Sequence, residues 1–159
     1  MKGSERALEG FKKLASGEAV WYMLLCRGKA GCGKTHLCQA LVSGLSGRIW
    51  EWNEVVTALK EAMHDEYRGK HDDRLRAFKQ AKYLVLDDVG MGTTGSVWEM
   101  GVLDEIINYR YREELLTVVT TNLDLKELPE RVVSRFRDAV TSRVVVIEAD
   151  DYRPKKGQK

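Results

Sequence analysis

The sequence predicts one α/β domain of three layers, in which helices cover both faces of a five-stranded parallel sheet. Two observations lead to this prediction. Apolar runs rich in strand-forming residues alternate with segments of helical composition along the 159 residues, and this alternation is typical of parallel sheets with right-handed crossovers. The first apolar run also breaks into a glycine-rich loop that leads into a helical segment.

Composition sets the remaining bounds. Hydrophobic and charged contents of 43% and 31% are globular values, so we expect a domain over residues 1–153 and a disordered polar tail over 154–159. No apolar run approaches the roughly 20 residues that span a bilayer, and the N-terminus lacks a signal-peptide core. The three cysteines form no C-x-x-C pair, which favours reduced thiols over a zinc or disulfide framework. We therefore expect a cytoplasmic protein without a membrane partner.

The first third of the chain predicts four elements. Residues 1–16 carry an apolar stripe at helical spacing and end at Ser16-Gly17. Residues 21–26 are apolar throughout, as in a strand at the centre of a parallel sheet. A helix over 34–43 follows the glycine-rich loop, and residues 48–52 alternate as a short strand.

The middle of the chain contains the most highly charged segment. Asn53 is a plausible cap for a helix over residues 54–64. Residues 67–79 predict either a solvated helix pair or a helix and a loop. Residues 82–89 form an apolar strand that ends in two acids, and 96–114 predict a long helix with a core-facing side.

The last third completes the alternation. Residues 115–120 are a β-branched buried strand, and Leu128-Pro129 opens a helix over 130–139, with proline near its first turn. Residues 142–148 form the fifth strand, and a polar segment follows from 150 to 159.

The glycine-rich loop has the spacing G-x-x-x-x-G-K-[ST], from Gly28 to Thr35, which is the phosphate-binding loop. Its glycines allow backbone conformations closed to other residues, and its amides and the following helix N-terminus attract phosphate. Lys34 can reach the terminal phosphates, and the Thr35 hydroxyl can bind Mg²⁺. The sequence therefore predicts nucleoside triphosphate binding by Gly28, Lys29, Ala30, Gly31, Cys32, Gly33, Lys34, Thr35 and His36.

Two strand ends supply further candidates. Asp87 and Asp88 close the apolar run LVLDD, and ligands of parallel sheets bind at the carboxyl ends of the strands. Asp87 can hold Mg²⁺ through water, and Asp88 can polarise an attacking water. Asn122 ends the next buried strand and can orient that water near the γ-phosphate.

Arg131 and Arg135 lie four residues apart on one face of the helix expected over 130–139. They either form surface salt bridges or include an arginine finger, a guanidinium that neutralises charge on the γ-phosphate in the transition state. An arginine in this place could serve a neighbouring subunit.

Together, GKAGCGKTHL, LVLDDVG, TTNLDLKELPERVVSRFRD and a final DDYR resemble the AAA+ module of bacterial replicative helicase loaders of the DnaC/DnaI type. Transposition helper ATPases of the IstB type share much of this pattern. The resemblance covers about residues 5–153. It implies a P-loop NTPase fold with sheet order 5-1-4-3-2 and no C-terminal lid.

The resemblance also implies an ATPase with ATP/ADP and Mg²⁺ as its ligands. Lys34, Asp87, Asp88 and Asn122 would be its catalytic residues, with Thr35 and Asp87 at the metal. Arg135, or alternatively Arg131, would act as the finger in trans within a homo-oligomer that forms with ATP. Many AAA+ proteins have Asp-Glu where this chain has Asp-Asp, so we expect slow hydrolysis that depends on assembly and DNA.

Single-stranded DNA would follow the helical insertion that the family carries after its second strand, here within Asn53–Gln80. Six Lys/Arg and six Asp/Glu fall in this range, so we expect weak, salt-sensitive binding; a solvated surface laced with salt bridges is the alternative. The candidate phosphate contacts are Arg68, Lys70, Arg74, Arg76 and Lys79.

The resemblance allows more than one binding partner. Full-length loaders grip the replicative helicase through an N-terminal domain that this chain lacks, so we expect helicase contact to need that domain. A transposition helper is the alternative function, in which ATP is a structural ligand and the protein assembles on duplex DNA. A metabolic P-loop kinase is disfavoured, because it offers no role for Asn122 and the two arginines.

Overall fold

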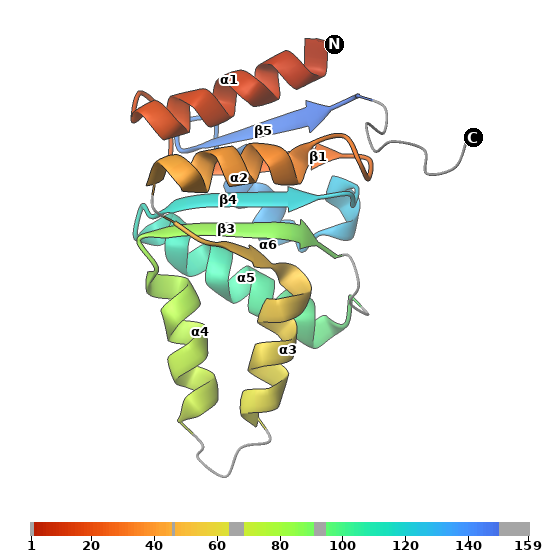
Figure 1. Ribbon diagram of the computed structural model, residues 1–159. Coiled ribbons are helices and arrows are strands. Elements are labelled where there is room, and N and C mark those ends of the chain that lie inside the picture. Colours follow the sequence, from red (N-terminus) through yellow and green to blue (C-terminus); the bar gives the residue numbers. More distant parts are fainter. Residues whose placement is uncertain (1, 46, 64–68, 91–94, 150–159) are drawn as a thin grey trace, which may run out of the picture.

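The computed structural model describes residues 2–45, 47–63, 69–90 and 95–149. Its centre is a parallel sheet with strand order β2-β3-β4-β1-β5 (Figure 1). Read from the other edge, this is the expected order 5-1-4-3-2, so the predicted sheet is confirmed. The strands are β1 (Met23–Gly28), β2 (Ile49–Glu51), β3 (Tyr83–Val89), β4 (Leu116–Thr121) and β5 (Ser142–Ile147).

Helices cover both faces of the sheet, as predicted. One face packs against α1 and α2, and the other against α5 and α6 (Figure 1). The remaining helices, α3 and α4, pack against each other and extend from the sheet beyond its β2–β3 side. The bounds are α1 (Lys2–Ser16), α2 (Lys34–Leu45), α3 (Trp52–Met63), α4 (Lys70–Gln80), α5 (Val97–Arg112) and α6 (Glu130–Arg137).

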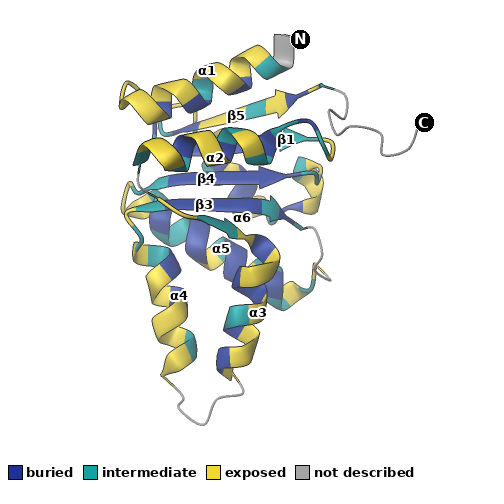
Figure 2. Cartoon of the chain, in the orientation of Figure 1, coloured by how far each residue is buried: buried dark blue, intermediate teal, exposed yellow. Residues whose placement is uncertain are grey.

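Alternation along the strands divides the apolar residues between two cores. In β1, Met23 and Leu25 pack into the core under α3, α5 and α6, whereas Leu24 and Cys26 pack under α1 and α2. The central strands are buried on both faces, and the outer sides of α1 and α4 are exposed (Figure 2). Successive strand residues point to opposite faces, which explains why an unbroken apolar run was the right signal for these strands.

Two details differ from the expectations. Helix α3 begins at Trp52, so Asn53 lies inside the helix and does not cap it. A short 3-10 helix, η1 (Leu125–Glu127), follows β4 and was not expected. Of the two alternatives for residues 67–79, the structure shows a helix, α4, paired with α3. The tail expected over 154–159 lies outside the described residues.

A fully buried arginine ties α4 to the sheet. Arg110 of α5 donates to the carbonyls of Phe78, Lys79 and Ala81 at the end of α4. Its other nitrogens donate to the Thr117 hydroxyl at 2.8 Å and the Leu116 carbonyl at 2.7 Å, both at the start of β4. Burial lowers the pKa of Arg110 to about 10. One cation therefore satisfies carbonyls from two elements that the chain brings together only by folding.

No helix among the described residues is both long enough and apolar enough to cross a membrane.

Candidate nucleotide-binding site

The phosphate loop joins β1 to α2, and its glycines serve two different purposes. Gly31 and Gly33 have φ of 76° and 98°, which only glycine adopts readily. Gly28 is different, because its backbone lies outside the left-handed region. A Cβ on Gly28 would lie 2.6 Å from Cys32 Sγ and 2.8 Å from the Ile147 carbonyl oxygen. The sequence argument from backbone freedom is therefore wrong for Gly28, where close approach excludes a side chain.

Lys34, the first residue of α2, is 4% exposed and points back into the loop. Its Nζ donates to the carbonyls of Gly28 at 2.9 Å and Lys29 at 3.0 Å. It also donates to Asn122 Oδ1 at 2.7 Å. The ammonium is thus held at the centre of the loop by neutral acceptors, which leaves its charge available to a phosphate oxygen.

Thr35 and Asp87 come together beside this lysine, although they are far apart in the chain. Thr35 Oγ1 donates to Asp87 Oδ2 at 2.8 Å, and Asp87 is 2% exposed. The Thr120 hydroxyl donates to the other carboxylate oxygen, Oδ1. A hydroxyl and a carboxylate held side by side are hard oxygen ligands of the kind Mg²⁺ prefers, and Mg²⁺ commonly takes only one or two protein ligands next to phosphates. The donor set therefore fits the ion.

Asp88 follows in an unusual backbone conformation. Its φ is 54°, which is uncommon for a residue other than glycine and more tolerated by aspartate than by most. The Asp88 N–H donates to Thr120 Oγ1 at 2.9 Å. Asp88 is half-buried. Thr120 therefore binds the Asp87 carboxylate and the Asp88 backbone, a role that sequence reasoning missed.

Asn122 lies just after β4, in a turn that a second overlooked residue holds. Arg27, the penultimate residue of β1, donates from Nε to the Leu123 carbonyl at 2.9 Å and pairs with Asp124. The signal in the sequence was a lone charge at the end of an apolar strand. These contacts bring the ends of β1 and β4 together.

The structure places Arg135 away from the phosphate loop of its own chain. The Arg135 carbonyl accepts from Ser142 Oγ, and Ser142 pairs with Met23, the first residue of β1. The phosphate loop follows the carboxyl end of β1. Arg135 therefore lies at the opposite side of the sheet, beside the first residues of β1 and β5. Its guanidinium stacks on Tyr111, 4.6 Å from the ring centroid, and donates to Asn108 at 3.0 Å.

Arg131 is more exposed than Arg135. Its side chain is 76% exposed and pairs with Asp104 at 3.4 Å. The expectation of a surface salt bridge thus describes Arg131 in the isolated subunit.

The candidate DNA contacts on α4 have protein partners in the isolated chain. Arg74 donates to the Ala58 carbonyl of α3 at 2.6 Å, and Arg76 pairs with Asp73 at 3.5 Å. Lys79 pairs with Glu105 at 2.9 Å. Lys70 is exposed at the start of α4. Arg68 lies outside the described residues.

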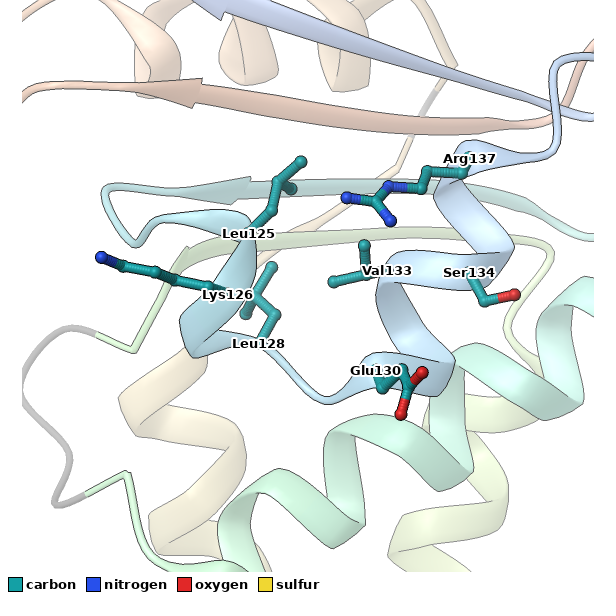
Figure 3. Close-up of a pocket in the computed structure, with 7 residues that line it drawn as sticks. All are labelled: Leu125, Lys126, Leu128, Glu130, Val133, Ser134 and Arg137. Carbon is teal, nitrogen blue, oxygen red and sulfur yellow. The ribbon is translucent and has the colours of Figure 1, made fainter.

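A separate groove of about 490 Å³ lies between η1 and α6, away from the loop. The Arg137 side chain extends from α6 across this groove toward Leu125 (Figure 3). The groove is walled by a mixture of apolar and charged side chains: Leu125, Lys126, Leu128, Glu130, Val133, Ser134 and Arg137.

The cysteines near the loop lie in the core and are not exposed as reactive thiols. Cys26, Cys32 and Cys38 are all buried and reduced. Burial raises the pKa of the Cys26 thiol to about 12 and raises the pKa of Cys38 well above its usual range. Both remain neutral thiols at physiological pH, so they act as small apolar residues.

Comparison with known proteins identifies the family of this chain. The model of the family of IstB-like ATP-binding proteins matches residues 10–158. A putative ATP-binding protein of an insertion sequence in Mycobacterium tuberculosis is 28% identical over 95% of this chain and 62% of its own length. The chromosomal replication initiator DnaA of onion yellows phytoplasma is 24% identical over 95% of this chain and 31% of its own length. The chain thus spans about 62% of the length of the insertion-sequence relative and about a third of the length of DnaA.

Solved structures show the same fold. The crystal structure of the DnaC helicase loader matches with a TM-score of 0.74 and 27% identity, over 91% of this chain and 89% of that one. DnaI matches at 0.73 and 24% identity, over 92% and 86%. AMPPCP-bound DnaA from Aquifex aeolicus matches at 0.75 and 23% identity, over 94% and 48%. This chain therefore belongs to the family of IstB-like ATP-binding proteins and is an AAA+ ATP-binding domain with a P-loop α/β fold.

Proposed function

We propose that this chain is the ATPase module of a helicase loader, which binds ATP with Mg²⁺, assembles with further copies of itself and binds single-stranded DNA in the cytoplasm. One observation carries the proposal. Lys34 and Thr35, adjacent at the phosphate loop, form hydrogen bonds to Asn122 and Asp87, which come from two other segments of the chain. A buried cation beside a buried carboxylate has a direct use where a triphosphate and a divalent cation bind together.

In the proposed reaction, a water oxygen forms a bond to the γ-phosphorus while the bond from that phosphorus to the β,γ-bridging oxygen breaks, giving ADP and phosphate. Lys34 binds the β- and γ-phosphate oxygens. Thr35 and Asp87 would hold Mg²⁺, which supplies charge neutralisation on those oxygens. Asp88 polarises the water and receives its proton, and Asn122 orients the water. Aspartate is one methylene shorter than the glutamate common at this position, which supports slow turnover.

The proposal places completion of the site on a neighbouring subunit. Arg135 lies at the opposite sheet edge from its own loop, so it can reach a γ-phosphate only in another copy. Stacking on Tyr111 and bonding to Asn108 hold its guanidinium in place before assembly. A trans arginine contributes about 10³–10⁵ in rate in NTPases where it has been measured.

The test is ATPase rate against protein concentration, with and without single-stranded DNA. Arg135→Ala should lose the concentration-dependent and DNA-stimulated rate while its ATP affinity stays within about twofold of wild type. Arg6→Ala, at an exposed position on α1, is the matched control. A mixture of Arg135→Ala with Lys34→Ala should be more active than either alone, because the Lys34 variant still offers Arg135 to its neighbour. An inactive mixture, or equal loss of ATP affinity, would contradict action in trans.

The α3–α4 pair is the proposed DNA-binding element. It projects from the sheet beyond β2 and β3 (Figure 1), and its outer side is polar and exposed. The intramolecular partners of Arg76 and Lys79 must be exchanged for phosphates, which supports weak and salt-sensitive binding.

The second candidate is an ATP-dependent assembly protein of transposition that acts on duplex DNA. The family match and the insertion-sequence relative favour it, whereas the DnaC structure favours the loader. Fluorescence anisotropy with single-stranded and duplex oligonucleotides of equal length, in ATP, separates the two. Preference for single strands supports a loader whose replicative-helicase contact lies in a further domain; tight duplex binding that ignores single strands supports the transposition role.

A further inference from the structure

Arg27 lies beside the phosphate loop but has no role in the proposed reaction. It stands in β1 directly before Gly28, the first residue of the phosphate loop, and its side chain is 20% exposed. In the sheet it pairs with Thr121, the last residue of β4. Asn122 follows Thr121 directly in the chain, so Arg27 lies beside the start of the turn that carries Asn122.

The Arg27 guanidinium binds the turn after Asn122 at two points. Nε donates to the Leu123 carbonyl at 2.9 Å, and Nη2 forms an ion pair with Asp124. Two parallel contacts from a planar guanidinium fix orientation as well as distance. Lysine, with one rotatable ammonium, cannot make the same pair of bonds.

The remaining hydrogen bonds of this turn are made by the residues on either side of Asn122, so those residues set the position of its backbone. Thr121 Oγ1 donates to the Val89 carbonyl and accepts from the Leu123 N–H, which fixes the start of the turn to β3. The Asp124 N–H donates to Glu127 in η1. The Asn122 side chain accepts a hydrogen bond from Lys34 at 2.7 Å, a contact that a γ-phosphate would compete for.

We propose that Arg27 is a positioning residue, which holds the turn at residues 122–124 so that the Asn122 amide stays beside Lys34 at the phosphate loop, where a γ-phosphate would meet it. The inference rests on the proposed function of Asn122. Arg27 acts through the turn and does not touch the reacting atoms. Without it, Asn122 stays in the chain but loses its fixed distance from the loop.

Discrimination between triphosphate and diphosphate tests the proposal without relying on turnover. Calorimetry with AMPPCP and with ADP, each with Mg²⁺, gives two dissociation constants for each variant. Arg27→Gln should lower the preference for AMPPCP over ADP about 10-fold, with ADP affinity unchanged, and should lower kcat about 10- to 100-fold, as expected for a misplaced group. Arg27→Lys should recover part of the preference. Arg48→Gln, at an exposed position directly before the edge strand β2, should match wild type.

A double-mutant cycle shows whether Arg27 acts through Asn122. If it does, Arg27→Gln combined with Asn122→Ala should discriminate no worse than Asn122→Ala alone. Multiplicative losses would overturn the proposal, as would a wild-type preference in Arg27→Gln. Thermal unfolding identifies general damage: a variant that loses affinity for ADP and AMPPCP alike also counts against a positioning role. Wild-type protein that discriminates but never hydrolyses would refute the proposed ATPase while the calorimetric ratios still decide the role of Arg27.

Discussion

Gly28→Ala is the substitution whose effect the structure defines most sharply. The added methyl carbon would stand 2.6 Å from Cys32 Sγ and 2.8 Å from the Ile147 carbonyl oxygen. Ordinary contacts begin near 3.4 Å, so both neighbours must retreat by about 0.6–0.8 Å. The Cys32 side chain lies in the loop itself, and Ile147 is the β5 residue paired with Gly28. Neither can move without disturbing the loop or the sheet.

Overpacking of this kind costs about 1–3 kcal/mol. In a chain of this length, 1 kcal/mol corresponds to about 2–4 °C in Tm. We therefore expect Gly28→Ala to lower Tm by about 2–12 °C. If the loop moves instead of the sheet, part of the same cost appears as lost nucleotide affinity, at about tenfold per 1.4 kcal/mol.

Circular dichroism melting and calorimetric titration with ATP measure both effects. Gly101→Ala is the matched control, because Gly101 is an exposed glycine within α5 with open space around its Cβ position. That change should stabilise the protein by about 0.4–1 kcal/mol. A Gly28→Ala protein with unchanged Tm and unchanged ATP affinity would refute the close-packing explanation for this glycine.

Three further predictions concern other parts of the fold. Lys34→Ala should abolish measurable ATP binding in calorimetry, and an unchanged affinity would contradict the loop assignment. Arg110→Met should destabilise the protein by about 3–5 kcal/mol in urea unfolding, because it leaves buried carbonyls unpaired; Arg112→Met, exposed at the end of α5, should have little effect. Ellman's reagent at pH 8 should not modify Cys26 or Cys38 in the folded protein, because their raised pKa values keep them protonated, but should modify both after unfolding in guanidinium. Rapid labelling of folded protein would show that the α2 face of the sheet opens.

Much of the fold was predictable because its signals are local. The phosphate loop has a fixed spacing, and buried parallel strands appear as short apolar runs such as YLVLDDV. The helix start at Ser96 was visible because Ser96 and Glu99 form a capping box within four residues. Boundaries such as Trp52 at the start of α3 were not, because burial of its side chain in the core extends the helix past Asn53.

The residues of the candidate site also differ in whether a local sequence signal identifies them. Lys34 could be nominated from the fixed spacing of the loop, and Asp87 and Asn122 because they lie close to the ends of apolar strands. Arg27 and Thr120 could not, because their importance comes from partners more than 30 residues away in the chain. The orientation of Arg135 likewise depends on Asn108 and Tyr111 of a different helix.

The sequence by itself determined the order of the elements and the kind of ligand, because hydrophobic period and glycine spacing act over a few residues. Only the tertiary structure decided why Gly28 must be glycine, which hydroxyl holds Asp87, and which end of the sheet carries Arg135. The first two features arise where the carboxyl ends of β1, β3, β4 and β5 meet, and Arg135 lies at the other ends of β1 and β5. Hydrogen bonding and steric exclusion act over a few ångströms, so they operate only between groups that folding has already brought into contact.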